Sequence, residues 1–219
     1  MSVKMNNHMN DAKKTFIINL KKEIKNKDII SAFEKIDQKN FFDSIFSNNL
    51  YCDDPIPIGC GQKSDSLKAL ARMINYLSPD KNSRILEVGT GSGYSTAIIS
   101  SIAKEVVTIE YFEELALSAK DRLDNLGTKN VKFLTGNAFE YETSAAHFDG
   151  AIIFAAYHER PLYLFQFLKK NSTIVFPMGP PHEQQIAVLK PKKDKKSGGE
   201  YSVTFHEFCS FSPMIDIYE

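Results

Sequence analysis

A glycine-rich segment between a predicted strand and a predicted helix constrains the fold of this chain more than any other feature. The run Arg84–Val88 is mostly apolar, carries one acid at Glu87, and precedes a helical pattern over 94–102. Between them lie glycines at three alternate positions, Gly89, Gly91 and Gly93. Alternate glycines let the main chain turn sharply and let a ligand lie against the backbone. The segment therefore predicts the first strand, ligand-binding loop and helix of a doubly wound α/β fold.

A second apolar run, Val106–Ile109, ends in Glu110. In doubly wound folds an acid at the end of the second strand binds the two hydroxyls of a ribose. The spacing G-x-G-x-G, with an acid two residues before it, differs from the G-x-G-x-x-G of dinucleotide sites. It resembles motif I of the Rossmann-like S-adenosylmethionine methyltransferases, whose ligand has no phosphate. The resemblance implies S-adenosyl-L-methionine as cofactor, and the alternative is a plain glycine turn in another α/β protein. The implied cofactor-binding residues here are Glu87, Gly89, Thr90, Gly91, Gly93, Glu110 and Tyr111.

Length and charge limit the other possibilities. The 219 residues are enough for one domain with a small extension, and the formal net charge is zero. Zero net charge gives no electrostatic reason to expect a specific nucleic acid or an anionic membrane as partner. No apolar run approaches the ~20 residues of a membrane span, and the polar start of the chain lacks a signal-peptide core. Three cysteines without C-x-x-C spacing favour neither disulfides nor a metal site, so we expect a cytoplasmic protein. We also expect a monomer.

The first 62 residues are expected to form an extension ahead of the main fold. Residues 1–10 are rich in Asn and Met and lack an apolar period, so they are expected to be disordered. Helical spacing of apolar residues predicts helices over 12–25 and 28–36, followed by one or two turns near Phe41–Phe46. Two prolines and two glycines in 55–61 exclude a helix and indicate a stiff extended loop. The predicted division is a disordered segment 1–10, a helical cap with its loop 11–62, and the main domain 63–219.

A third helix is predicted from Ser64 to Leu77, with Ser64, Asp65 and Ser66 crowding its N-terminus. The stretch before it reads D-x-P-I-P-I-G-x-G-Q from Asp53 to Gln62. Together with the glycine loop, this stretch resembles the protein-L-isoaspartate O-methyltransferase family. The similarity runs from about Lys25 to Met214 and includes further segments, among them Phe148–Ile153, Phe176–Gly179 and Phe208–Met214.

The resemblance implies methyl transfer to the α-carboxylate of L-isoaspartyl residues in damaged proteins or peptides, which are then its partners. It implies a Rossmann-like, mostly parallel seven-stranded sheet with an antiparallel C-terminal hairpin and an N-terminal helical cap. The catalytic positions that it implies are Ser64, Asp65 and Ser66, and it places the adenine beside Asn137 and Ala138. It also implies substrate contacts from the loop that carries Tyr157, His158 and Arg160. No metal is expected, because a carboxylate acceptor is already ionised near neutrality.

Two positions depart from the family's pattern. The family reads Thr-Ile-Ser after Gly-Gln, whereas this chain reads Lys63-Ser64-Asp65, so Asp65 replaces the serine beside the acceptor. The family's Gly-Asp-Gly after the third strand appears here as Gly136-Asn137-Ala138. An ionised Asp65 at contact distance would repel a carboxylate by about 1 kcal/mol in water and about 4 kcal/mol at an effective dielectric of 20.

We therefore expect Asp65 to point outward as a helix cap and leave Ser64 or Ser66 to hold the acceptor. The alternatives are that Lys63 neutralises Asp65, or that Asp65 faces the acceptor. For the whole chain, the alternatives are a related methyltransferase with another acceptor, such as a small metabolite or a tRNA base, and a cofactor-binding relative with weak or no isoaspartyl activity.

Overall fold

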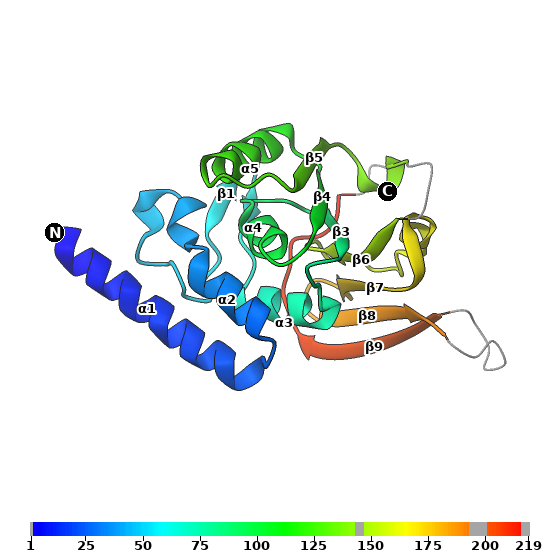
Figure 1. Ribbon diagram of the computed structural model, residues 1–219, viewed down its shortest axis with the longest axis horizontal. Coiled ribbons are helices and arrows are strands. Elements are labelled where there is room, and N and C mark those ends of the chain that lie inside the picture. The colour runs from blue at the N-terminus through cyan, green and yellow to red at the C-terminus, as the bar shows by residue number, and fades with distance from the viewer. Residues whose placement is uncertain (1, 143–146, 193–200, 216–219) are drawn as a thin grey trace.

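The computed structural model describes the chain except residues 1, 143–146, 193–200 and 216–219 (Figure 1). Its centre is a seven-stranded sheet with the order β5-β4-β3-β6-β7-β8-β9. The pairs among β5, β4, β3, β6 and β7 are parallel, and β8 and β9 are added antiparallel. This arrangement confirms the predicted fold class. The strands are β3 Arg84–Val88, β4 Glu105–Glu110, β5 Val131–Thr135, β6 Phe148–Ile153, β7 Leu168–Met178, β8 Gln185–Pro191 and β9 Tyr201–Phe208.

The sheet separates two apolar cores, because successive side chains of a strand point to opposite faces. Ile85 and Ile152 belong to one core, and their neighbours Leu86 and Ile153 belong to the other. The first core lies beneath the helices α1 Ser2–Glu23, α2 Lys27–Lys35, α3 Leu67–Leu77 and α4 Tyr94–Ser100. The second core is covered by short 3₁₀ helices, η3 Ala138–Glu140 and η4 Leu162–Phe167. Helix α5, Glu113–Asn125, packs beside β4 and β5.

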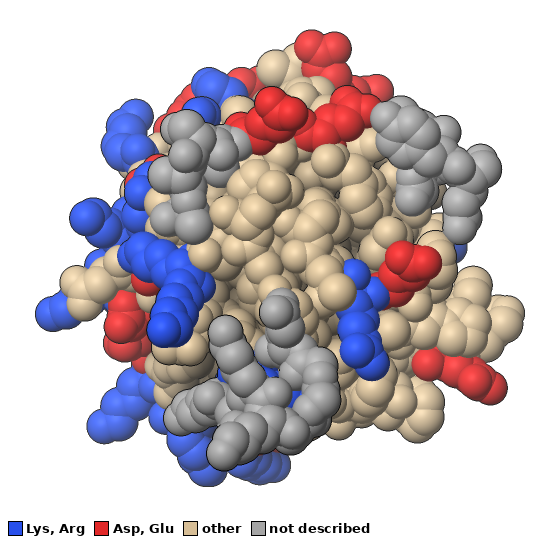
Figure 2. All heavy atoms as spheres, turned by 90° about the vertical axis from the view of Figure 1, so that its right-hand side faces the viewer, with Lys and Arg blue, Asp and Glu red and all other residues tan. Residues whose placement is uncertain are grey.

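The two cores differ in how the chain covers them. Longer helices cover the first, while turns of three to six residues cover the second. On the face seen from the right-hand side of Figure 1, charged side chains of both signs surround a central area of uncharged residues (Figure 2).

Helix α1 begins at Ser2, so the prediction of disorder over residues 1–10 is wrong for residues 2–10. The first glycine or proline of the chain is Pro55, so no helix breaker interrupts the segment before α2. Asn26 separates the two helices as the N-cap of α2, where its side chain accepts hydrogen bonds from the backbone N–H groups of Asp28 and Ile29. The sequence pattern failed here because a polar helix has no apolar period.

The proline-rich loop forms a small antiparallel hairpin, β1 Pro57–Gly59 and β2 Gln62–Lys63. Its turn contains two residues with positive φ, Cys60 at 49° and Gly61 at 71°. Between α2 and this hairpin, the 3₁₀ helix η2 Ser44–Phe46 lies within the segment Phe41–Phe46 where one or two turns are predicted, and a further 3₁₀ helix, η1 Gln38–Asn40, precedes that segment. Helix α3 starts at Leu67, three residues later than the sequence predicts.

A core substitution in α2 tests whether the N-terminal helices and the sheet unfold together. Phe33 is fully buried, and its ring packs against Phe16 at 5.6 Å and Tyr94 at 6.2 Å between centroids. We expect Phe33→Ala to lower the free energy of unfolding by about 3–5 kcal/mol through the lost burial and the cavity. Ile45→Ala, at a side chain that is 74% exposed, should change it by less than about 0.5 kcal/mol. Urea unfolding followed by circular dichroism measures both, and a separate early transition of the helices alone would contradict the shared core.

Candidate active site

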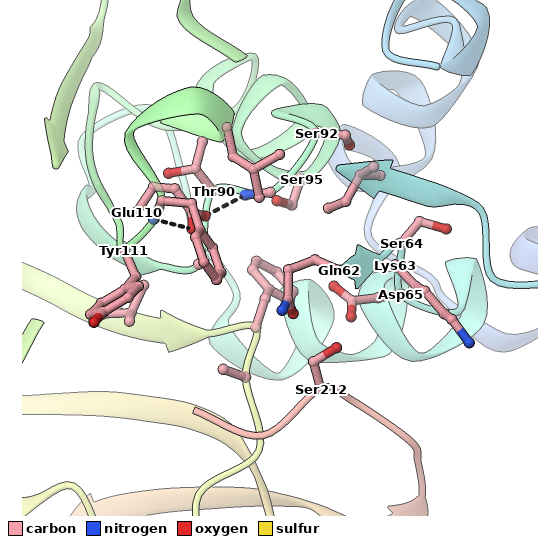
Figure 3. A pocket seen from close by; sticks show the side chains of 18 of the residues that line it. Gln62, Lys63, Ser64, Asp65, Thr90, Ser92, Ser95, Glu110, Tyr111 and Ser212 are labelled. Atoms are coloured by element: carbon pink, nitrogen blue, oxygen red, sulfur yellow. Dashed lines mark hydrogen bonds between the residues drawn. The ribbon is translucent and has the colours of Figure 1, made fainter. Parts of the chain in front are cut away.

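A pocket opens where the carboxyl ends of β3, β4 and β6 meet, between the two halves of the parallel sheet. The strand order reverses between β3 and β6, which is where open α/β sheets bind ligands. Segments from distant parts of the chain line it (Figure 3). Among them are Ile58, Gln62–Asp65, Val88–Ser92, Ile109–Phe112, Gly136–Ala138, Phe154–Ala155 and Ser212–Ile215.

The three glycines of the loop do not have one role. Gly89 and Gly91 line the pocket, with φ values of 89° and 54° that favour glycine. Gly93 is not among the lining residues and is the N-cap of α4. A Cβ atom at Gly93 would lie 2.9 Å from Leu123 Cδ1 and 3.0 Å from Ala119 Cβ. The absence of a side chain at Gly93 therefore lets the N-cap of α4 lie close to α5.

Glu110 at the end of β4 faces the pocket with its carboxylate held by the backbone. Oε2 accepts a hydrogen bond of 2.8 Å from Gly91 N–H, and Oε1 accepts one of 3.1 Å from Phe112 N–H. The residue is 6% exposed, and Tyr111 lies beside it at the rim (Figure 3). Each carboxylate oxygen has two lone pairs, so Glu110 can still accept hydrogen bonds from a pair of hydroxyl groups.

Asn137 contributes both a capping acceptor and a buried donor to this region. Its Oδ1 accepts a hydrogen bond of 3.0 Å from Phe139 N–H and caps η3. Its Nδ2 is buried and has no hydrogen-bond partner within the described part of the chain. Such an unmet donor costs about 1–3 kcal/mol unless a ligand accepts from it. Asn137 and its neighbour Ala138 both line the pocket, and their place beside the base of a ligand stays a prediction.

Thr90 and Glu87 support the loop from below. Thr90 lines the pocket, is 2% exposed, and its Oγ1 lies 2.6 Å from Thr108 Oγ1. Glu87 is fully buried and is not a lining residue. It accepts hydrogen bonds from Ser95 Oγ at 2.7 Å and Thr96 Oγ1 at 2.6 Å. These bonds tie β3 to the first turn of α4, so Glu87 positions the loop rather than lining the cavity.

Two of the three residues predicted to hold the acceptor have structural partners. Ser66 caps α3 and donates a hydrogen bond of 2.6 Å to Asp53 Oδ1. It does not line the pocket. Ser64 lines the pocket, but its Oγ accepts a hydrogen bond of 2.9 Å from Ile56 N–H, which stabilises the hairpin.

Asp65 points into the pocket, so the predicted outward orientation as a helix cap is wrong (Figure 3). The reason is local. Ser66 takes the N-cap position of α3, so Asp65 lies one residue before the cap and is free to turn toward the cavity. Burial raises the pKa of the Asp65 carboxyl well above its usual range, and the nearby Glu87 raises it further. Lys63 is exposed, and its amino group points away from Asp65 in Figure 3.

The segment Ser212–Ile215 lines the pocket although the sequence does not identify it as part of the site. Two backbone hydrogen bonds of 2.8 Å bring it there, from Ala156 N–H to Ser212 O and from Met214 N–H to Ala156 O. The side chains of the neighbouring loop, Tyr157, His158 and Arg160, are not lining residues. The sequence signal that could have indicated this segment is the family resemblance of Phe208–Met214, which includes its first three residues.

The buried Glu87 predicts a pH-dependent stability difference. Burial raises its pKa from 4.5 to about 7, although hydroxyl groups that include Thr96 and Ser95 lower it in part. Between these values the folded protein binds a proton that the unfolded chain has lost, so stability falls as pH rises through the window. We expect the free energy of unfolding of Glu87→Gln to increase relative to that of the wild type as pH rises from 4.5 to 7, by a total that approaches about 3 kcal/mol. Above pH 7 the difference between the two proteins should stay constant. Urea unfolding of both proteins between pH 4.5 and 8 measures the difference, and a constant difference would contradict the elevated pKa.

Comparison with known proteins gives a consistent family. The sequence model of the family described as protein-L-isoaspartate(D-aspartate) O-methyltransferase matches residues 10–218. Protein-L-isoaspartate O-methyltransferase 1 of Nitrosospira multiformis is 36% identical over 179 residues, which cover 82% of this chain and 74% of that protein.

Two solved structures share the fold. One is a protein-L-isoaspartate O-methyltransferase with a TM-score of 0.78 at 22% identity. The match covers 92% of this chain and 65% of the other protein's chain. The other, from Plasmodium falciparum, is titled as a putative protein-L-isoaspartate O-methyltransferase in complex with S-adenosyl-L-homocysteine. It has a TM-score of 0.72 at 22% identity and covers 92% of this chain and 97% of its own. With the family match spanning nearly the whole sequence, the chain belongs to the protein-L-isoaspartate(D-aspartate) O-methyltransferase family.

Proposed function

We propose that this protein transfers a methyl group from S-adenosyl-L-methionine to the α-carboxylate of L-isoaspartyl residues in damaged proteins and peptides. The observation that supports this best is the family match over residues 10–218. The relatives named above carry the same activity in their names. The reaction starts repair, because it activates a misplaced carboxyl group.

The pocket suits the proposed cofactor at both ends. Glu110 presents carboxylate oxygens that are oriented for two ribose hydroxyls, and the unmet Nδ2 donor of Asn137 suits an acceptor nitrogen of adenine. The bare backbone of Gly89 and Gly91 leaves room for the amino-acid end of the ligand. When bound, the cofactor supplies a methyl group that is already activated by a positively charged sulfur. The carboxylate of Glu110 in the pocket favours such a cation.

The protein's own residues have mainly a positioning role. An isoaspartyl carboxyl group has a pKa of about 3.5–4 in an unfolded peptide, so it is ionised near neutrality and no general base has to remove a proton. Placing the acceptor in line with the methyl group is then the main contribution, and it needs a dry, rigid site. Ile58 of the hairpin covers the glycine loop, since a Cβ atom on Gly91 would lie 3.3 Å from Ile58 Cδ1. The hairpin thus closes one side of the pocket.

We extend the proposal to organisation and surroundings. Residues 63–219 act as the cofactor-binding methyltransferase domain and residues 11–62 as a helical cap with its loop. The chain works as a monomer in the cytoplasm, on isoaspartyl proteins rather than on a specific nucleic acid. In the parts of the chain that the structure describes, no helix is long and apolar enough to cross a membrane. A formal net charge of zero supports a protein partner over nucleic acid.

A peptide pair tests the proposed reaction directly. Labelled S-adenosyl-L-methionine is supplied with a synthetic peptide that contains one isoaspartyl residue, and with its normal aspartyl twin. We expect base-labile label on the isoaspartyl peptide, and about a hundredfold less on the twin, because the carboxylate of the twin lies one methylene away from the required position. Equal labelling of both peptides, or of neither, would contradict the function.

Glu110→Ala tests the cofactor site. Losing hydrogen bonds to a charged acceptor costs about 1.5–3 kcal/mol, so we expect the affinities for S-adenosyl-L-methionine and S-adenosyl-L-homocysteine to fall about ten- to a hundredfold. Glu113→Ala removes the same side chain at an exposed position in the first turn of α5 and should leave both affinities within about twofold. Isothermal calorimetry measures the affinities, and a melting curve checks that each variant is folded. Unchanged affinity in Glu110→Ala would remove Glu110 from the site.

A further inference from the structure

We propose that Asp65 is the acceptor-specificity residue of this enzyme: as a neutral acid it donates a hydrogen bond to the acceptor carboxylate, and as an anion it excludes that acceptor. The proposal rests on the proposed isoaspartyl function and names the group that limits it. It predicts that acceptor binding weakens in alkaline solution and that the carboxamide analogue removes this limit.

Asp65 lies in the wall of the pocket, opposite Glu110 (Figure 3). The residue lies between the end of β2 at Lys63 and the cap of α3 at Ser66, and its carboxyl group points into the pocket (Figure 3). Gln62 and Ser212 lie beside it, while Glu110 lies across the cavity (Figure 3). Because Glu110 and Asn137 suit the nucleoside, Asp65 lies at the end of the pocket that remains for the acceptor.

The carboxyl groups in and beneath the pocket differ in their hydrogen bonds. Glu110 accepts from two backbone N–H groups, and Glu87 accepts from two hydroxyl groups. Asp65 makes no hydrogen bond to any residue that the structure describes. A half-buried carboxylate without donors is unfavourable, so this group is the one in the pocket that gains most from holding a proton.

The charges around Asp65 point in the same direction. Glu87 approaches it from β3, and the Cys209 thiol approaches from the segment after β9. Burial comes first and Asp65 second among the causes that raise the pKa of Cys209 to about 12, so the thiol stays neutral. Lys63 is the last residue of β2, but its amino group points away from Asp65, and Gln62 and Ser212 are uncharged (Figure 3). No cation faces Asp65 in the described part of the pocket, so burial and Glu87 both favour the neutral acid.

A neutral acid beside an incoming carboxylate forms a short, strong hydrogen bond, because donor and charged acceptor share one proton. Two ionised carboxylates at the same distance repel instead. The proton remains on Asp65 during methyl transfer, since the acceptor carboxylate has none to lose. An acceptor with a proton to remove, such as a hydroxyl or an amine, would need the opposite state, with Asp65 ionised as a general base.

Steady-state kinetics with the isoaspartyl peptide between pH 5.5 and 9.5 tests the proposal. We expect the wild-type KM for the peptide to rise about tenfold per pH unit above the pKa of Asp65, with kcat changing by less than about threefold. Asp65→Asn should keep a low KM throughout, because its amide donates at every pH, so above the pKa of Asp65 its kcat/KM should exceed that of the wild type by a factor that grows about tenfold per pH unit. Asp121→Asn, which removes a carboxylate on the exposed side of α5, should follow the wild-type profile.

Calorimetry provides a readout that does not depend on catalysis. The protein saturated with S-adenosyl-L-homocysteine is titrated with the isoaspartyl peptide at several pH values from 6 to 9.5, each in two buffers of different ionisation enthalpy. As the pH rises through the pKa of Asp65, we expect net uptake to increase toward one proton for the wild type and for Asp121→Asn, and to stay at none for Asp65→Asn.

Parallel pH profiles of the wild type and Asp65→Asn, or equal proton uptake by both, would overturn the role of Asp65 while leaving the isoaspartyl function in place. Activity that rises with pH and is lost in Asp65→Asn would overturn it in favour of a general base. If no variant methylates or binds the isoaspartyl peptide at any pH, the proposed function fails, and the role of Asp65 fails with it. Melting temperatures in the presence of S-adenosyl-L-homocysteine show whether each variant is folded.

Discussion

The hydrogen bond from Gly91 N–H to the Glu110 carboxylate is the interaction on which the site depends. It joins the loop after β3 to the end of the neighbouring parallel strand, and a second bond, from Gly89 N–H to Ile109 O, holds the same two strand ends together. Gly91 adopts a positive φ there, a conformation that favours glycine, and a side chain at this position would meet Ile58 of the hairpin. The hydrogen bond between Gly91 and Glu110 therefore positions both the glycine backbone that lines the pocket and the carboxylate that faces the pocket.

The sequence could predict this region because its determinants are local. A strand, alternate glycines, a helix and an acid at the next strand end occupy fewer than thirty consecutive positions, about one βαβ unit. The side-chain environments of the loop were less predictable. Gly93 lies against α5, and Glu87 lies under the loop, although both belong to the same motif as Gly91. Motif spacing gives the backbone path, but the choice between lining a pocket and filling a core depends on elements that pack from elsewhere.

The acceptor side was less predictable for a related reason. Ser66 rather than Asp65 caps α3. This shift of one residue in the cap position decides whether the Asp65 side chain faces solvent or the cavity. Both residues are good caps by propensity, so the local sequence does not decide between them. Ser66 has a second partner in Asp53, thirteen positions earlier in the chain, and this contact is visible only in three dimensions. The same limit applies to Ser212–Ile215, which reaches the pocket through backbone bonds to Ala156.

The N-terminal helices determine how the hairpin reaches the pocket. Tyr51 has a φ of 61°, a conformation that costs a non-glycine residue about 1–2 kcal/mol. Buried hydrogen bonds offset that cost: Tyr51 N–H donates to Gln38 Oε1 at 2.6 Å, Gln38 N–H donates to the Tyr51 hydroxyl at 2.9 Å, and that hydroxyl donates to Asp37 at 2.9 Å. The strained turn at Tyr51 is thus held by the segment that follows α2, and it directs the chain through 52–56 into the hairpin. Because the hairpin carries Asp65 at its end, the acceptor side of the pocket is set by a segment outside the sheet, while the cofactor side is set by the sheet itself.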